Sequence, residues 1–126
     1  NEALYYRAKA YTKQKADKKA MEDYRELAKD TRNPYGAEAK YQVAQSLYDA
    51  QEYAAAEKEL LNYIEQSTPH AYWLARSFIL LSDVYHATGK DLDARQYLLS
   101  LQQNYQGNDD IESMIESRLS KLKVEN

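Results

Sequence analysis

Residues 78–98 read FILLSDVYHATGKDLDARQYL, and the spacing of their small and bulky residues recurs twice earlier in the chain. In each copy a small residue is followed by a bulky residue, then by an alanine, and finally by a second bulky residue. The three sets are Ala8-Tyr11-Ala20-Tyr24, Ala44-Leu47-Ala56-Leu60 and Ser82-Tyr85-Ala94-Leu98. Repeats of 36 and 38 residues are typical of stacked helix-turn-helix units, because one unit is too small to bury its own apolar face.

The composition agrees with an all-helical fold. The chain has 126 residues, only three Gly and two Pro, and it is rich in Ala, Leu, Glu and Lys, which favour helix. It has no cysteine, which excludes disulfides, thiolate metal sites and cysteine nucleophiles. No apolar run approaches the roughly 20 residues that cross a bilayer. Because the chain opens at Asn1 inside the first expected helix, we expect it to be the C-terminal segment of a longer protein.

Seven helices are predicted from the hydrophobic periodicity and from the residues that interrupt it. Residues 33–36 contain Pro and Gly and separate the second helix from the third. Thr68 is a candidate N-cap, with Pro69 at the first helical position, and Gly89 is a candidate C-cap. The expected ranges are about 2–14, 17–31, 36–50, 53–66, 69–88, 91–104 and 110–123.

The last predicted helix has the features of a cap. Asp109 followed by Glu112 forms a capping-box-like start, and Arg118, Lys121 and Lys123 near its end suit the helix dipole. One face is polar, and the other is an apolar stripe made of Ile111, Met114, Ile115, Leu119 and Leu122. A terminal helix that covers the last repeat on one side and meets water on the other has this pattern.

Over residues 1 to about 105 these positions resemble the tetratricopeptide repeat (TPR) family, most clearly in residues 78–98. Lys15 and Gln51 stand where the family has a turn glycine, Pro34 and Pro69 fall late, and the repeats exceed the usual 34 residues. The longer repeats are similar to bacterial envelope members, which favours a periplasmic or envelope-associated protein over a cytoplasmic one. The resemblance implies a right-handed superhelical stack in one domain, 1–126, with repeats 1–34, 35–69 and 70–106 and a capping helix at 108–124.

The small residues of the pattern have a physical role in this fold. Ala8 with Ala20, Ala44 with Ala56, and Ser82 with Ala94 are expected where the two helices of each repeat cross. Only short side chains let helix axes approach to about 8–10 Å. We therefore expect large substitutions at these positions to be among the most damaging in the chain.

The resemblance implies a non-catalytic scaffold that binds a peptide or partner protein on the concave face, lined by the first helix of each repeat. Tyrosine beside amides and mixed charge suits such a surface, since a rigid ring gives apolar area and one hydrogen bond. Thr12, Lys13, Asp49 and Ile79 are expected to point the same way as the assigned residues. The residues assigned to the partner are Tyr5, Lys9, Tyr41, Gln45, Tyr48, Arg76, Asp83 and His86.

Several alternatives remain open at this point. The tyrosines could simply pack against one another, since the chain has 13 of them. The segment could instead be the structural end of a longer array or a self-association module, and a sugar could stack on Tyr5, Tyr41 and Tyr48. The family's carboxylate clamp is disfavoured, because its matching positions, Tyr5, Lys9, Gln42, Arg76 and Leu80, keep only one or two basic residues.

Other functional classes have less support. No Gly-rich phosphate loop, HExxH motif or nucleophile elbow is present, so we predict neither an enzyme nor a cofactor. Asp83 and His86 share a helical face but lack further metal ligands, so no metal site is predicted. Residues 1–33 hold nine Lys/Arg against six Asp/Glu, but the net charge of −3 argues against nucleic acid.

Overall fold

The computed structural model describes residues 1–66 and 68–122, and in these residues it is all-helical. The seven expected helices are all present among the described residues, so the prediction of an all-α fold is confirmed. Their bounds are α1 (Glu2–Lys13), α2 (Asp17–Leu27), α3 (Pro34–Asp49), α4 (Tyr53–Glu65), α5 (Ala71–Ala87), α6 (Asp91–Asn104) and α7 (Ile111–Leu119).

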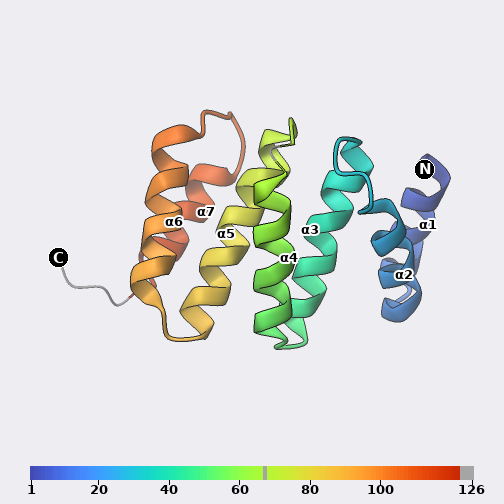
Figure 1. Cartoon of the computed structure of the whole chain (residues 1–126), viewed down its shortest axis with the longest axis horizontal. Coiled ribbons are helices and arrows are strands. Elements are labelled where there is room, and N and C mark those ends of the chain that lie inside the picture. The colour runs from blue at the N-terminus through green and yellow to red at the C-terminus, as the bar shows by residue number, and fades with distance from the viewer. Residues whose placement is uncertain (67, 123–126) are drawn as a thin grey trace.

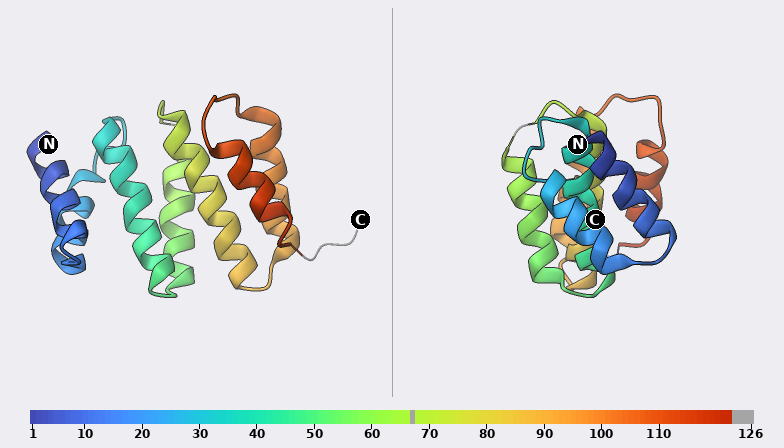
Figure 2. Two further views of the ribbon diagram at one scale, coloured as in Figure 1. Left: turned by 180° about the vertical axis from the view of Figure 1, so that it is seen from behind. Right: turned by 90° about the vertical axis from the view of Figure 1, so that its right-hand side faces the viewer.

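The helices form two layers in a row (Figures 1 and 2). One layer holds α1, α3, α5 and α7, and each of these contacts the next. The other layer holds α2, α4 and α6, which contact the first layer but not one another. Each even-numbered helix packs on the odd-numbered helices before and after it in the chain. The first layer therefore presents one continuous surface, which we call the odd-helix face.

The small residues of the repeat pattern are buried, as predicted. The six residues are at most 4% exposed, and Ser82 satisfies its hydroxyl by donating a 2.9 Å hydrogen bond to the carbonyl oxygen of Ile79. Larger residues of the pattern, including Tyr24, Leu47, Leu60 and Tyr85, belong with the alanines to one continuous core cluster. The spacing found in the sequence thus marks the core positions of each helix pair.

The turn inside each helix pair has the same backbone geometry. Lys15, Gln51 and Gly89 all have a positive φ, of 60°, 61° and 80°. In each turn the next residue's N–H donates to a carbonyl near the end of the preceding helix, as Glu52 does to Leu47. The left-handed conformation favours glycine, so Gly89 fits its position, while Lys15 and Gln51 carry strain there.

We expect Gln51→Gly to raise the free energy of unfolding by about 0.5–1 kcal/mol, because it removes the steric cost of a side chain at positive φ. Gly89→Ala is the matched reverse change, since a Cβ at Gly89 would meet no atom within 4 Å and only the backbone conformation opposes it. Urea unfolding should show opposite shifts of the midpoint for the two variants. Equal shifts in the same direction would contradict the role given to this turn.

The structure corrects three predicted helix ends. α2 ends at Leu27 rather than residue 31, and α3 begins at Pro34 rather than residue 36, because the Asn33 side chain caps it by accepting a 2.9 Å hydrogen bond from the Tyr35 N–H. α5 begins at Ala71 rather than residue 69. Thr68 is not its N-cap and instead donates a 3.0 Å hydrogen bond to the Tyr63 hydroxyl.

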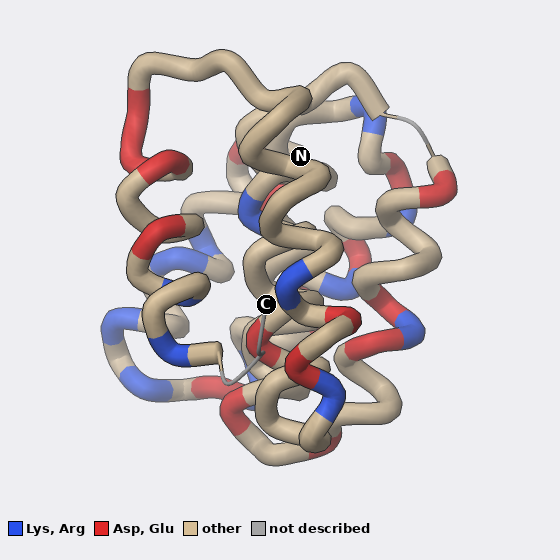
Figure 3. The backbone as a smooth tube through the Cα atoms, turned by 90° about the vertical axis from the view of Figure 1, so that its left-hand side faces the viewer, with Lys and Arg blue, Asp and Glu red and all other residues tan. Residues whose placement is uncertain are grey.

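The last helix is shorter than predicted. α7 ends at Leu119, and Lys123 and position 124 of the predicted cap lie outside the described residues. The carboxylate of Asp109 accepts a 3.0 Å hydrogen bond from the Ile111 N–H, although Asp110 is the residue that precedes the helix. Figure 3, viewed from this end, shows acidic residues at the start of α7 and a basic residue beyond its last turns. Ile111 and Ile115 are buried in a second core cluster, against α5 and α6.

Candidate functional site on the odd-helix face

The eight residues assigned to a partner lie on α1, α3 and α5, the helices of the odd-helix face. The polar atoms of seven of them, all except Tyr48, are joined into separate hydrogen-bonded groups that follow one another along the row of helices. The hydrogen bonds within each group show which side chains already have partners inside the protein and which still have polar groups available to bind a ligand.

The first group joins α1 to α3 through Glu38. The Tyr5 hydroxyl donates a 2.8 Å hydrogen bond to one carboxylate oxygen of Glu38, and the Lys9 amine lies 2.6 Å from the other. Burial is the largest single influence on Lys9 and lowers its pKa, but the hydrogen bonds and charges of Glu38 and Tyr5 together outweigh burial and raise the pKa of Lys9. Glu38, which is 8% exposed, was not predicted, although it precedes Tyr41 on the same face of α3. Both predicted residues of this group are therefore paired within the protein.

The second group is centred on Tyr41. Its hydroxyl donates a 2.9 Å hydrogen bond to the Gln45 amide oxygen and accepts a 3.0 Å hydrogen bond from Arg76. Gln45 in turn donates to Asp49 at 2.9 Å. Tyr41 is only 5% exposed, and burial raises its pKa although the charge of Arg76 opposes the rise. Tyr41 thus contributes its hydroxyl to the network while its ring belongs to the core.

Arg76 is the only side chain of the assigned set that is surrounded mainly by aromatic rings. Its guanidinium carbon lies 4.9 Å from the ring centre of Tyr41, 5.7 Å from that of Tyr72 and 5.8 Å from that of Trp73. It donates to the Tyr72 hydroxyl at 2.8 Å, and that hydroxyl donates to Asp110. The buried Nε atom has no hydrogen-bond partner among the described residues, and Arg76 forms no ion pair with them.

The third group joins α5 to α7. Arg118 donates from Nε and Nη2 to the two carboxylate oxygens of Asp83, at 3.2 and 3.4 Å. Burial raises the pKa of Asp83, and the hydrogen bonds from Arg118 oppose the rise. His86 lies 2.8 Å from a carboxylate oxygen of Asp91. Within residues 1–66 and 68–122 no group of three or more His, Asp or Glu residues could hold a metal ion.

The remaining residues expected on this face differ in their exposure. Tyr48 is half-buried and packs edge-on against Tyr53, with ring centres 5.5 Å apart. The prediction that Ile79 points into the groove is wrong, because α7 lies beside α5 in the same layer. Ile79 is buried in one cluster with Ile111 and Ile115 of that helix. The sequence indicated a cap but not which side of α5 it would cover.

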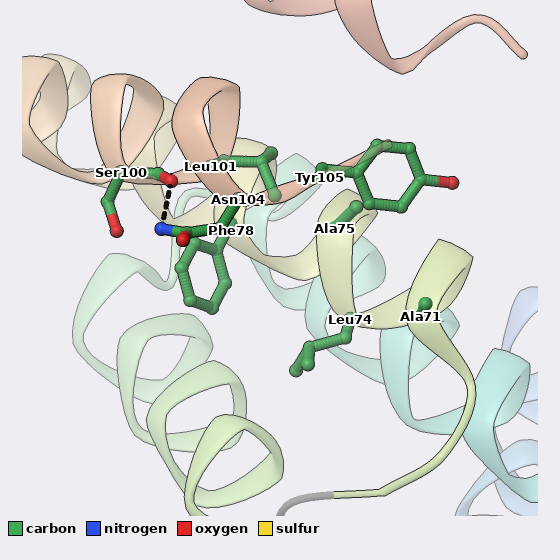
Figure 4. A pocket seen from close by; sticks show the side chains of 8 residues that line it. All are labelled: Ala71, Leu74, Ala75, Phe78, Ser100, Leu101, Asn104 and Tyr105. Atoms are coloured by element: carbon green, nitrogen blue, oxygen red, sulfur yellow. Dashed lines mark hydrogen bonds between the residues drawn. The ribbon is translucent and has the colours of Figure 1, made fainter. Parts of the chain in front are cut away.

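A small apolar pocket lies between α5 and α6 (Figure 4). It has a volume of about 260 Å³ and is lined by Ala71, Leu74, Ala75, Phe78, Ser100, Leu101, Asn104 and Tyr105. Phe78 contacts Tyr97 edge-on at the positions where the preceding repeat has the 2.9 Å ion pair of Lys40 with Glu59. The third repeat thus has two aromatic rings where the second repeat has an ion pair, which accounts for the apolar character of this part of the surface.

No known protein-family model matches the chain, and no curated protein sequence matches it. The part of the chain that the structure describes holds no helix both long and apolar enough to span a membrane.

Proposed function

We propose that this protein is a non-catalytic scaffold that binds an extended peptide segment of a partner protein along the odd-helix face. Arg76 is the observation that carries the proposal. It connects α5 to Tyr41 of α3, its charge is unpaired within residues 1–66 and 68–122, and aromatic rings surround it. A guanidinium in this setting is suited to a carboxylate of the bound segment, since charge-assisted hydrogen bonds are the stronger ones.

The other side chains of the odd-helix face fit the same role. Lys9 and Asp83 are held in place by Glu38 and Arg118, so they offer fixed rather than mobile charges. Half-buried Tyr5 and Tyr48 offer ring edges and lose little conformational entropy on binding. A surface that is organised before binding avoids part of the ordering cost of association.

The resemblance to the TPR family supports the proposal at the level of architecture. In a right-handed superhelical stack of such repeats, the face lined by α1, α3, α5 and α7 is the concave one. We propose this arrangement for the chain, with α7 as the cap of the third repeat. Periplasmic or envelope-associated bacterial members with longer repeats are the proposed relatives.

Peptides selected from a displayed random library on the immobilised protein test this function. We expect the selected peptides to lose about tenfold or more in affinity for Arg76→Gln, because a hydrogen bond to a charged group contributes about 1.5–3 kcal/mol. Arg95→Gln on α6, in the other layer, is the matched control and should bind as the wild type does. Peptides that ignore Arg76→Gln but respond to Arg95→Gln would place the binding surface on the even-numbered helices instead.

Self-association is the competing function, and one exposed side chain favours it. Tyr6 is 59% exposed on α1, at the end of the row, with exposed Ala3 and Ala10 on the same helix. Light scattering over a concentration series separates the two functions. A monomer at all concentrations fits peptide binding, whereas a dimer that Tyr6→Ser disrupts would assign this end of the row to assembly.

A further inference from the structure

A cleft of about 460 Å³ opens between the first and second helix pairs, within the size range of ligand sites. One side is formed by α1 and α2 and the other by α3, and Gln45 and Asp49 connect it to the odd-helix face. Ala20, Met21 and Tyr24 give it an apolar part. Its polar lining consists of Thr12, Asp17, Gln42, Gln45, Ser46 and Asp49.

The next junction along the row shows that this cleft is not required by the fold. Tyr48 and Tyr53 occupy the positions of α3 and α4 that correspond to Thr12 and Asp17, and their rings pack together there. Gln42 and Ser46 correspond to Leu80 and Val84, which are each 2% exposed in the core. The same architecture is therefore filled with apolar side chains at one junction and left open and polar at the other.

The open, polar junction between the first two helix pairs has less buried apolar packing than the junction between the second and third pairs. Replacing two tyrosines, a leucine and a valine by smaller or more polar residues removes buried apolar area, which contributes about 25 cal/mol per Å² to stability. Losses of this kind are typical of sites shaped for binding, where function and stability compete. The contrast between the two junctions thus points to a ligand at the first one.

The chemistry of the lining defines the ligand. Asp17 and Asp49 face the cleft from α2 and α3, and neither forms an ion pair within residues 1–66 and 68–122. No Lys or Arg is among the residues that line the cleft. An aliphatic stem against Met21 and Tyr24 with a cationic nitrogen between the carboxylates matches this lining.

We propose that the cleft binds the amine or guanidinium group of a lysine or arginine side chain, carried by the segment that lies along the odd-helix face. The source of that side chain rests on the proposed function, whereas the cation site itself does not. The bound segment would then place a basic residue in the cleft between α2 and α3 and an acidic residue at Arg76, which fixes its direction.

Single-residue probes test the site without a partner protein. Nα-acetyl-lysine methylamide and Nα-acetyl-arginine methylamide are titrated into the ¹⁵N-labelled protein, with Nα-acetyl-norleucine methylamide as the uncharged control. We expect amide shifts at Asp17, Gln42 and Ser46 with both basic probes and not with the control. Asp49→Asn should weaken the response several-fold, and Asp93→Asn, an exposed change on α6, should leave it intact.

The triple variant Thr12→Tyr, Asp17→Tyr, Ser46→Val rebuilds the apolar filling of the second junction. We expect it to abolish the shifts and to raise the urea midpoint, a combination that simple misfolding does not give. Basic probes that act no more strongly than the norleucine control would overturn the site. If the cleft bound cadaverine but neither of the two basic amino-acid probes, the assignment would also be overturned, since the site would then bind a free amine. Neither of these results affects the test of the proposed function with Arg76→Gln.

Discussion

Gly36→Ala should lower the free energy of unfolding by about 3 kcal/mol, the upper end of what overpacking commonly costs. Gly36 lies in the first turn of α3, where α2 ends against it. A Cβ at this position would overlap the carbonyl oxygen of Asp30 and lie 2.7 Å from that of Leu27. Both are backbone atoms, so relief requires the end of α2 to move away from α3. Alanine elsewhere in a helix stabilises relative to glycine by about 1 kcal/mol, so the sign of the effect is diagnostic.

Gly107→Ala is the control for this measurement. A Cβ there would meet only side-chain atoms, the ring end of half-buried Tyr105 and the carboxylate of exposed Asp109, which can shift without any movement of the backbone. Urea unfolding should show a change within about 0.5 kcal/mol for Gly107→Ala, as for ordinary surface substitutions. A stabilised Gly36→Ala variant would show that α2 and α3 do not approach as closely as described.

The sequence predicted the fold well where a pattern repeats and poorly where a contact is unique. The repeated small residues placed the seven helices to within a few residues and marked buried positions in each helix pair. The expectation that Leu92 is buried in α6 is wrong, because its side chain is 60% exposed. The start of α3 was missed because Gly36 was interpreted as a turn residue, whereas it allows two helices to pack closely. A single sequence does not distinguish these two uses of glycine, since both need the absence of a Cβ.

The candidate site was predicted as a surface but not as a network. Helical spacing put Tyr41, Gln45 and Arg76 on one face, and the structure joins them by hydrogen bonds. Arg118 was assigned only to the helix dipole, because its partner Asp83 is 35 residues away and no local pattern links them. Glu38 could have been found from its position on the same stripe as Tyr41, three residues earlier in the chain.

Ala56→Leu is the second change with a large expected effect, a loss of about 1–3 kcal/mol of stability from overpacking. Ala56 is 0% exposed in α4 and lies in the same core cluster as Ala44 of α3. The added side-chain atoms have no free volume to enter, because protein interiors are close-packed. They would force α3 and α4 apart or drive neighbouring side chains out of their rotamers. Urea unfolding should show a lower midpoint with an unchanged slope.

Ala55→Leu provides the control, because Ala55 is exposed on the same helix and the change in helix propensity is identical. The difference between the two variants therefore isolates the packing of α4 from its intrinsic stability. An unchanged midpoint for Ala56→Leu would mean that the small residues of the repeat do not define the helix contacts. The same comparison at Ala94 should give a similar loss, since Ala94 holds the equivalent buried position in the third repeat. A loss at both positions would establish that the repeat pattern marks a structural constraint shared by successive helix pairs.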